Sequence, residues 1–267
     1  MKKIAVLGLL CTVALVAFFN WKSPGKAPTI NENKLRIGVV AGPHATIMDH
    51  VSKMAKKDGL TIDVVEFNDF LLPNAALDQG EIDVNCYQHK PFLDEQIKSR
   101  GYKIQSLAQS VLMPMGIYSN KIKDLGTLSV GSKIGIPNDP TNGGRALLLL
   151  QKAGVITLKA STNPSVLDID HNPKSIKIVE LEAPHLPRSL DDLDAAVINT
   201  DWIVVANINP KSTLFNEDRN SPYMNIIAVR KGDEKNPTIQ KFVALYQSPE
   251  TKDFIDKEFK GVVIPGW

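Results

Sequence analysis

Residues 136–150 read Ile136-Pro-Asn-Asp-Pro-Thr-Asn-Gly-Gly-Arg-Ala-Leu-Leu-Leu-Leu150, and they show the unit from which the fold is built. An apolar strand ends at Ile136, and a loop of proline, asparagine, aspartate and glycine follows it. A run of strong helix formers begins directly after the loop, at about Gly144. A strand, a short loop and a helix in this order are typical of α/β proteins.

The same alternation of strand and helix extends from Leu35 to the end of the chain. β-Branched runs predict strands, and apolar residues at helical spacing between glycine and proline breaks predict helices. This rhythm predicts mainly parallel, twisted sheets that are covered by helices on both faces. The expected strands are 35–40, 61–67, 81–87, 104–109, 115–118, 133–136, 177–181, 195–198 and 224–230, and the expected helices are 45–57, 74–79, 91–100, 144–153, 186–191, 200–207, 237–246 and 249–259.

Two such units joined by extended segments predict two lobes with a cleft between them. We expect the chain to cross near residues 113–116 and to return near residues 224–230, which brings the last helices back to the first lobe. The expected domains are a leader and linker (1–33), a first lobe (34–113 with 226–267) and a second lobe (114–225). Clefts at the carboxyl ends of parallel strands are where such sheets bind ligands.

The first 33 residues have the layout of a signal peptide or a short membrane anchor. Lys2 and Lys3 precede an uncharged run over residues 4–19, and a linker rich in proline, glycine, lysine and asparagine follows. We therefore expect the body on the outer face of the cytoplasmic membrane or in the periplasm. Cys11 lies in the run and is either a lipidated cysteine or an apolar filler, and the segment is either cleaved or kept as an anchor.

Charge and motifs exclude several classes of function. Without the two N-terminal lysines the chain carries 29 basic and 29 acidic residues, so it lacks the basic excess that nucleic acid binding needs. The sequence has no Gly-x-Ser-x-Gly elbow and no Walker A loop, and the five histidines show no metal-ligand spacing. None of these patterns therefore supports an enzyme.

The loop in residues 136–150 is a candidate site for a carboxylate. Asn142 is placed to cap the helix, and Gly143 and Gly144 let a ligand approach the backbone. Free N–H groups at a helix start attract an anion, and Arg145 in the first turn can hold a carboxylate through two hydrogen bonds. The same pattern also fits an ordinary capped helix with a solvated arginine.

Further candidates stand at the ends of other strands, where they would face the same edge of the sheets. Phe67, Phe70, Tyr87 and His89 could enclose an apolar ligand side chain, although core packing explains a phenylalanine equally and most lone histidines are structural. A second pair of candidates consists of Asn199 and Asn225, whose amides could bond the polar end of an amino acid. For Asn199, capping of the helix from Thr200 is the simpler interpretation.

Several of these stretches resemble the methionine-binding lipoprotein family of ABC importers, and the resemblance runs from about Leu35 to the end of the chain. The central block 136–154 is the most specific of them. The stretches are Gly42-Pro-His-Ala45, Val65-Glu-Phe-Asn-Asp-Phe70, Pro73-Asn74, Tyr87-Gln-His89, residues 136–154, Ile178-Val-Glu-Leu-Glu-Ala-Pro184, Val197-Ile-Asn-Thr200 and Ser221-Pro-Tyr-Met-Asn225.

The resemblance implies a two-lobed periplasmic-binding fold of the second type that closes on methionine without a cofactor. It implies that Asn142 and Arg145 hold the carboxylate and that Asn199 and Asn225 bond the polar end, while the four aromatic candidates line the thioether pocket. The ligand would be L-methionine, D-methionine or a small methionine peptide. The partners would be a membrane permease and the membrane itself, and the body would be monomeric. An envelope enzyme or interaction protein on the same fold is the alternative.

Two positions depart from the family pattern. Phe70 stands where relatives often have tyrosine, which removes one hydroxyl. Gly8, Leu9 and Leu10 precede Cys11, where lipoprotein signals usually carry small residues.

Overall fold

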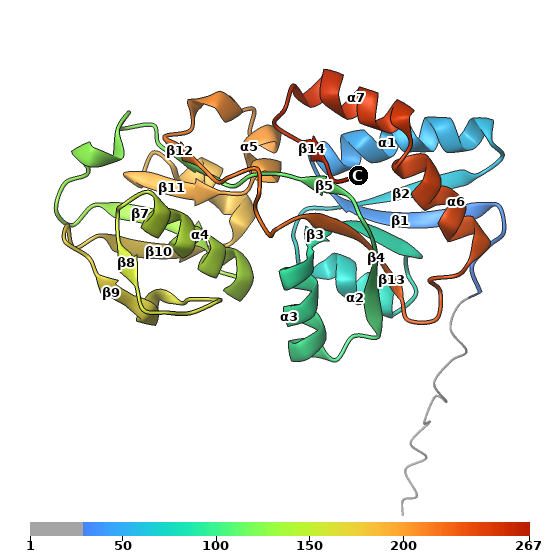
Figure 1. Cartoon of the computed structure of the whole chain (residues 1–267), viewed down its shortest axis with the longest axis horizontal. Coiled ribbons are helices and arrows are strands. Elements are labelled where there is room, and N and C mark those ends of the chain that lie inside the picture. The colour runs from blue at the N-terminus through green and yellow to red at the C-terminus, as the bar shows by residue number, and fades with distance from the viewer. Residues whose placement is uncertain (1–28) are drawn as a thin grey trace, which may run out of the picture.

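The computed structural model describes residues 29–267, which form two lobes side by side (Figure 1). Each lobe is built on a five-stranded sheet, and the chain passes between the lobes twice. The expected leader, with Cys11, lies outside the described residues. Among residues 29–267, no helix has the length and the apolar character that crossing a membrane requires.

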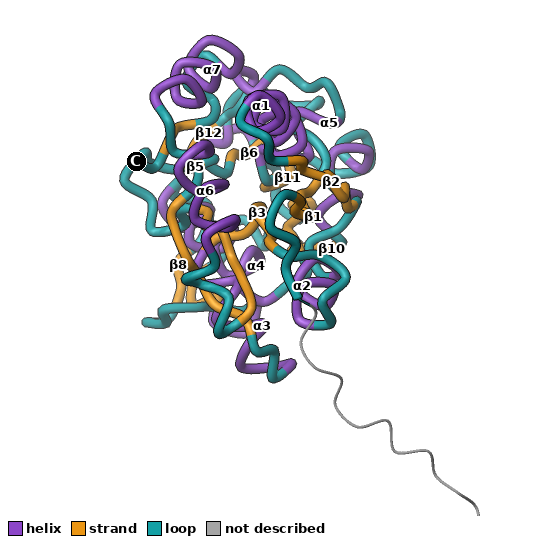
Figure 2. The backbone as a smooth tube through the Cα atoms, turned by 90° about the vertical axis from the view of Figure 1, so that its right-hand side faces the viewer, coloured by secondary structure: helices purple, strands orange, loops and turns teal. Residues whose placement is uncertain are grey.

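The first lobe has the strand order β2-β1-β3-β13-β4. Strand β13 is antiparallel to both of its neighbours, and the other four strands run in one common direction. Helices lie on both faces of this sheet (Figure 2). The elements are β1 (Lys34–Val40), α1 (Pro43–Lys57), β2 (Thr61–Phe67), α2 (Leu72–Asp78), β3 (Val84–His89), α3 (Lys90–Arg100), β4 (Ile104–Gln109), β13 (Asn225–Arg230), α6 (Pro237–Tyr246) and α7 (Pro249–Phe259).

Strand β13 shows why this sheet needs helices on both faces. Its side chains alternate, so Ile227 and Val229 enter the core beneath α1, α6 and α7. Ile226 and Ala228 point the other way, into the core beneath α2 and α3. A strand buried on both faces reads as an unbroken apolar run rather than an alternating one. The buried stretch Ile226-Ile-Ala-Val229 follows that rule.

The second lobe has the strand order β10-β7-β11-β6-β12, and again one strand, β6, is antiparallel to both neighbours. Helix α4 packs Ala146, Leu147 and Leu150 onto one face of the sheet, in one core with Ile134 and Ile136 of β7. The elements are β6 (Gly116–Tyr118), β7 (Lys133–Pro137), α4 (Pro140–Lys152), β8 (Thr157–Leu158), β9 (Ile169–His171), β10 (Lys177–Leu181), β11 (Ala195–Ile198), α5 (Thr200–Val205) and β12 (Phe215–Asn216).

The two crossings lie beside the carboxyl ends of the sheet strands. The outward crossing follows β5 (Val111–Leu112), which pairs with the C-terminal strand β14 (Ile264–Pro265). The return crossing spans residues 217–224, between β12 and β13. It therefore precedes the stretch 224–230 that we expected to cross, because residues 225–230 already pair with β3 and β4 in the first lobe.

Two expectations for helices are wrong in detail. Helix α4 begins at Pro140 instead of Gly144, because Asp139 caps it by accepting a hydrogen bond from the Asn142 N–H. Asn142 is thus inside the first turn and is not the N-cap. The helix expected at 186–191 consists of short 3₁₀ turns, Ala183–His185 and Pro187–Ser189, each with proline at its start.

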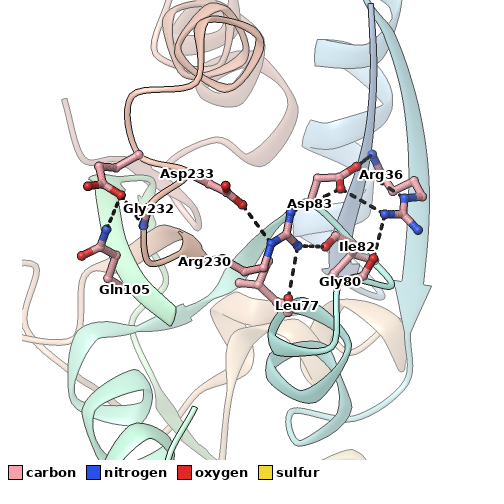
Figure 3. A network of polar contacts seen from close by, with 10 residues as sticks. Arg36, Leu77, Gly80, Ile82, Asp83, Gln105, Arg230, Gly232 and Asp233 are labelled. Atoms are coloured by element: carbon pink, nitrogen blue, oxygen red, sulfur yellow. Dashed lines mark hydrogen bonds and ion pairs between the residues drawn. The ribbon is translucent and has the colours of Figure 1, made fainter. Parts of the chain in front are cut away.

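A buried ionic network joins the middle strands of the first lobe to the turns beside them (Figure 3). Arg230, at the end of β13, donates from Nη1 to the carbonyl oxygens of Leu77 and Ile82, and its Nη2 lies 3.6 Å from Asp83 Oδ1. Asp83 also accepts from the backbone N–H of Arg36 at 2.8 Å and pairs with its guanidinium at 3.1 Å. One buried carboxylate therefore compensates two arginines.

We expect Asp83→Asn to destabilise the protein by roughly 3 kcal/mol, because it removes the buried carboxylate that pairs with both Arg36 and Arg230 and leaves Arg230 with Asp233 as its remaining acidic partner among the described residues. The matched control is Asp63→Asn, which removes an exposed ion pair with Lys34 and should cost about 0–1 kcal/mol. Urea denaturation of both variants measures the difference. Equal losses in the two variants would contradict a stabilising role for this network.

Candidate functional site

A cavity lies between the lobes and is lined by side chains from both. Its walls come from strand ends, helix starts and the outward crossing. Seven of the eight residues predicted from the sequence line it, and Phe67 does not. The lining residues are Phe70, Tyr87, Gln88, His89, Phe92, Met113 and Asn225 from the first lobe and the outward crossing, and Asn142, Arg145, Asn199, Thr200 and Asp201 from the second lobe.

Phe67 belongs to the core of the first lobe. Its side chain packs against the cluster of Val40, Tyr87 and Phe92. Its ring also lies close to Gly38, where a Cβ would stand 3.1 Å from Phe67 Cε2. Phe67 therefore supports the aromatic wall of the cavity without facing the cavity itself.

Aromatic rings form one wall of the cavity. The ring centroids of Phe70, Tyr87 and Phe92 are separated by 6.2–6.3 Å, and Phe70 also contacts Trp202 of the second lobe at 5.2 Å. The Tyr87 hydroxyl donates to the Phe70 carbonyl oxygen at 2.9 Å, so the polar atom of this ring is satisfied within the protein. The wall is apolar and suits an apolar ligand group.

His89 is both the cap of helix α3 and part of the cavity wall. Its Nδ1 accepts a hydrogen bond from the Phe92 N–H at 3.1 Å, so the proton of the neutral ring resides on Nε2. That Nε2 donates across the cleft to Asn142 Oδ1 at 3.3 Å. Burial, with a smaller effect from Arg145, lowers the pKa of His89 to about 3 and keeps the ring neutral.

Asn142 uses its whole hydrogen-bonding capacity within the protein. Its Nδ2 donates to both carboxylate oxygens of Asp139, at 3.1 and 3.0 Å. Its Oδ1 accepts from Asn199 Nδ2 at 2.9 Å and from His89. The start of helix α4 is thus already occupied by Asp139, whose pKa burial raises. The arrangement makes Asn142 an organiser of the cavity, where we expected a direct carboxylate ligand.

Arg145 is held from three sides. Its Nε donates to Glu217 Oε1 at 3.0 Å and its Nη2 to Glu217 Oε2 and to the Met113 carbonyl oxygen, while the guanidinium carbon lies 4.5 Å from the Tyr223 ring centroid. Glu217 therefore occupies the fork that we expected to bind a ligand carboxylate through two bonds. Nη1 makes no hydrogen bond to any described residue and is the donor left for a ligand.

Asn199 and Asn225 each face the cavity from the end of a strand. Asn199 holds the N-cap position of α5, but its side chain makes no capping hydrogen bond. It donates instead to Asn142, and its buried Oδ1 has no partner among the described residues. The Nδ2 atom of Asn225 lies 3.2 Å from His44 Nε2. The interpretation of Asn199 as a helix cap is therefore wrong.

Sequence reasoning missed His44, which lies beside the cavity, and five lining residues, Gln88, Phe92, Met113, Thr200 and Asp201. Asp201 Oδ1 lies 3.6 Å from His44 Nε2 and forms no hydrogen bond with the described residues. Burial raises the pKa of Asp201 to about 7 and lowers that of His44 to about 3. An aspartate in the first turn of a helix is normally exposed and interacts favourably with the helix dipole. The position of Asp201 in the sequence therefore does not indicate a ligand site.

The described residues of the site offer groups that can recognise a ligand. At its polar end it presents the Arg145 Nη1 donor and the Asn199 and Asp201 acceptors, opposite the aromatic wall. Across residues 29–267, no three histidine, cysteine or acidic side chains are grouped closely enough to hold a metal ion. Such a cavity can enclose a small molecule with a polar, charged end and an apolar tail.

The neutrality of His89 predicts a pH effect on folding. Because its folded pKa of about 3 lies below the unfolded value near 6.5, the unfolded chain binds the extra proton. Stability should therefore be lost as pH falls from about 6.5 towards 3. We expect His89→Asn, which retains a capping oxygen, to lose less stability over that range than the ligand-free wild type. Denaturant titrations at several pH values test this, and parallel pH profiles would contradict it.

Comparisons with known proteins agree with this architecture over nearly the whole chain. Residues 35–267 match the model of the NlpA lipoprotein family. The D-methionine-binding lipoprotein MetQ of Yersinia pestis is 46% identical, over 98% of this chain and 97% of that protein. A nutrient-binding protein from Burkholderia cenocepacia, solved bound to methionine, has 50% identity and a TM-score of 0.85, over 87% of this chain and 100% of that one.

A crystal structure of the methionine-binding protein MetQ is 46% identical with a TM-score of 0.85, over 88% of this chain and 98% of that one. The fold is the two-lobed periplasmic-binding fold of the second type. This chain belongs to the NlpA lipoprotein family.

Proposed function

We propose that this protein binds methionine outside the cytoplasmic membrane and delivers it to an ABC importer. The observation that carries the proposal is the closed interlobe cavity, which has an arginine donor and amide acceptors at one end and aromatic rings at the other. Relatives and structural neighbours named for methionine binding, at 46–50% identity, support the same ligand.

Each part of methionine has a complementary part of the cavity. The carboxylate would accept from Arg145 Nη1, since Glu217 holds the rest of the guanidinium. The polar end would also meet Asn199 and Asn225, which Asn142 and His44 hold in place. The thioether is apolar and polarisable, so it would pack against Phe70, Tyr87 and Phe92 together with Met113.

Binding in this cavity would require the lobes to open and close. The His89–Asn142 hydrogen bond and the Phe70–Trp202 contact both cross the cleft, so the present arrangement is the closed one. A ligand that bridges the lobes stabilises the closed arrangement by its differential affinity for it. The permease would then distinguish the loaded protein from the empty one by its shape.

The proposed anchor, the lobe boundaries and the role as a carrier concern the whole chain. We assign residues 1–33 to an N-terminal anchor and linker, residues 34–113 with 225–267 to one lobe and residues 114–224 to the other, which moves the expected boundary by one residue because Asn225 begins β13. Relatives carry lipoprotein names, which supports anchoring at the outer face of the membrane. They are also named as binding proteins, which supports a carrier without catalytic activity. The body of this carrier would be monomeric.

Calorimetric titration of the body from Asn31 onward with L-methionine, D-methionine and glycyl-methionine tests the proposal. The protein is first unfolded and refolded, since a tightly bound ligand can co-purify and mask binding. We expect saturable one-to-one binding of at least one of the three, with leucine as the control for a general apolar amino acid site. Absence of heat and of thermal stabilisation with all three would refute the methionine assignment.

Arg145→Ala should weaken methionine binding by about 2–5 kcal/mol, because it removes a charged donor from a desolvated site. Since this change also unpairs Glu217, Glu217→Gln serves as the matched variant that keeps Arg145 and a neutral partner. We expect a smaller loss in Glu217→Gln, measured by the same titration. Near-wild-type affinity in Arg145→Ala would remove this residue from the site.

A further inference from the structure

Asp201 is a buried carboxylate with one oxygen, Oδ1, that no described residue satisfies, while the backbone N–H of Asp201 itself donates to the side chain. It stands in the first turn of α5, is 5% exposed and lines the cavity. Its Oδ1 accepts no hydrogen bond from the described residues. Buried carboxylates are normally paired or hydrogen-bonded, because an isolated buried charge is costly. Because Asp201 lines the cavity, a ligand bound there can supply the donor that Oδ1 lacks.

The groups around Asp201 do not supply a positive charge at bonding distance. His44, on α1 of the other lobe, is the group nearest to Asp201 at 3.6 Å, and burial keeps its imidazole neutral. The Arg145 guanidinium acts on Asp201 only through its field, because Glu217 is its ion-pair partner. The remaining neighbours on the cavity wall, Asn199 and Asn225, are uncharged.

Two unsatisfied acceptors lie close together in the chain at this end of the cavity, Oδ1 of Asp201 and Oδ1 of Asn199. Asn199, two residues before Asp201, has a buried Oδ1 with no partner among residues 29–267. A carboxylate oxygen and an amide oxygen require a donor, and an ammonium group provides three N–H donors with a full charge. Burial raises the pKa of Asp201 to about 7, so a cation beside it would keep the carboxylate ionised at neutral pH.

We infer that Asp201 binds the cationic amine of the ligand and makes a free ammonium group a requirement for binding, with Asn199 Oδ1 as a second acceptor. This inference rests on the proposed function and adds the chemical class that the site accepts. The class is a zwitterionic amino acid, with its ammonium at Asp201 and its carboxylate at Arg145. Molecules that present the same thioether and carboxylate without an amine are excluded.

The competing explanation gives Asp201 a purely structural role, in which its protonated carboxyl contacts His44 across the cleft. On that explanation, removing the charge would lower the affinity for every ligand that closes the cleft by the same factor. An ammonium contact, by contrast, affects only ligands that carry the amine. The two explanations therefore differ in ligand selectivity rather than in overall affinity.

The experiment compares L-methionine with 4-(methylthio)butanoate, which is methionine without its amine, on the wild type and on Asp201→Asn. We expect the wild type to bind the amine-free analogue at least about 30-fold more weakly than methionine. We also expect Asp201→Asn to lose at least about 30-fold for methionine and only a few-fold for the analogue. Asp192→Asn, an exposed carboxylate on the same lobe, is the matched control and should bind both like the wild type.

Two outcomes would overturn the inference. One is an equal fold-loss for both ligands in Asp201→Asn, and the other is equal affinity of the wild type for both. The second comparison does not depend on the variant, so the inference stays testable if Asp201→Asn fails to fold in a thermal melt. A wild type that binds neither ligand contradicts the proposed function itself, and this result is distinct from the other two.

Discussion

The side chain of Asn142 is the point where the two lobes and the cavity wall meet. It donates to Asp139 on its own helix, and it accepts from Asn199 and, across the cleft, from His89. Because all its bonds are made inside the protein, it fixes its neighbours rather than a ligand. The Phe92 N–H on Nδ1 fixes the tautomer of His89, so Nε2 donates to this amide oxygen, and Asn199 Nδ2 donates to the same oxygen.

A second constraint is the burial of charge beside the return crossing. Arg145 would be costly in a closed cavity without a counter-charge, and Glu217 supplies one from the segment that leads back to the first lobe. The pair fixes two of the three guanidinium nitrogens and leaves one toward the cavity. Pre-organisation of this kind lowers the entropy lost on binding, at the expense of a second hydrogen bond to the ligand.

Topology brings these groups together. In each sheet one strand opposes the others, β6 after the outward crossing and β13 after the return crossing. The crossings therefore run along the carboxyl ends of the remaining strands, where Asn138 follows β7 and Asn199 follows β11. Asn225 reaches the same cleft from the opposite direction, because it begins β13 instead of ending a strand.

The sequence by itself determined the α/β alternation and most element bounds, because apolar periodicity and glycine and proline breaks act over a few residues. It also pointed to seven of the residues that line the cavity, since strand ends in such folds face one edge. Tertiary structure alone decided the roles of those residues. Glu217 pairs with Arg145 across 72 positions of the chain, and His44 meets Asp201 across the cleft. Burial, hydrogen-bond saturation and an unpartnered carboxylate oxygen depend on such distant neighbours, and no local pattern of residues encodes them.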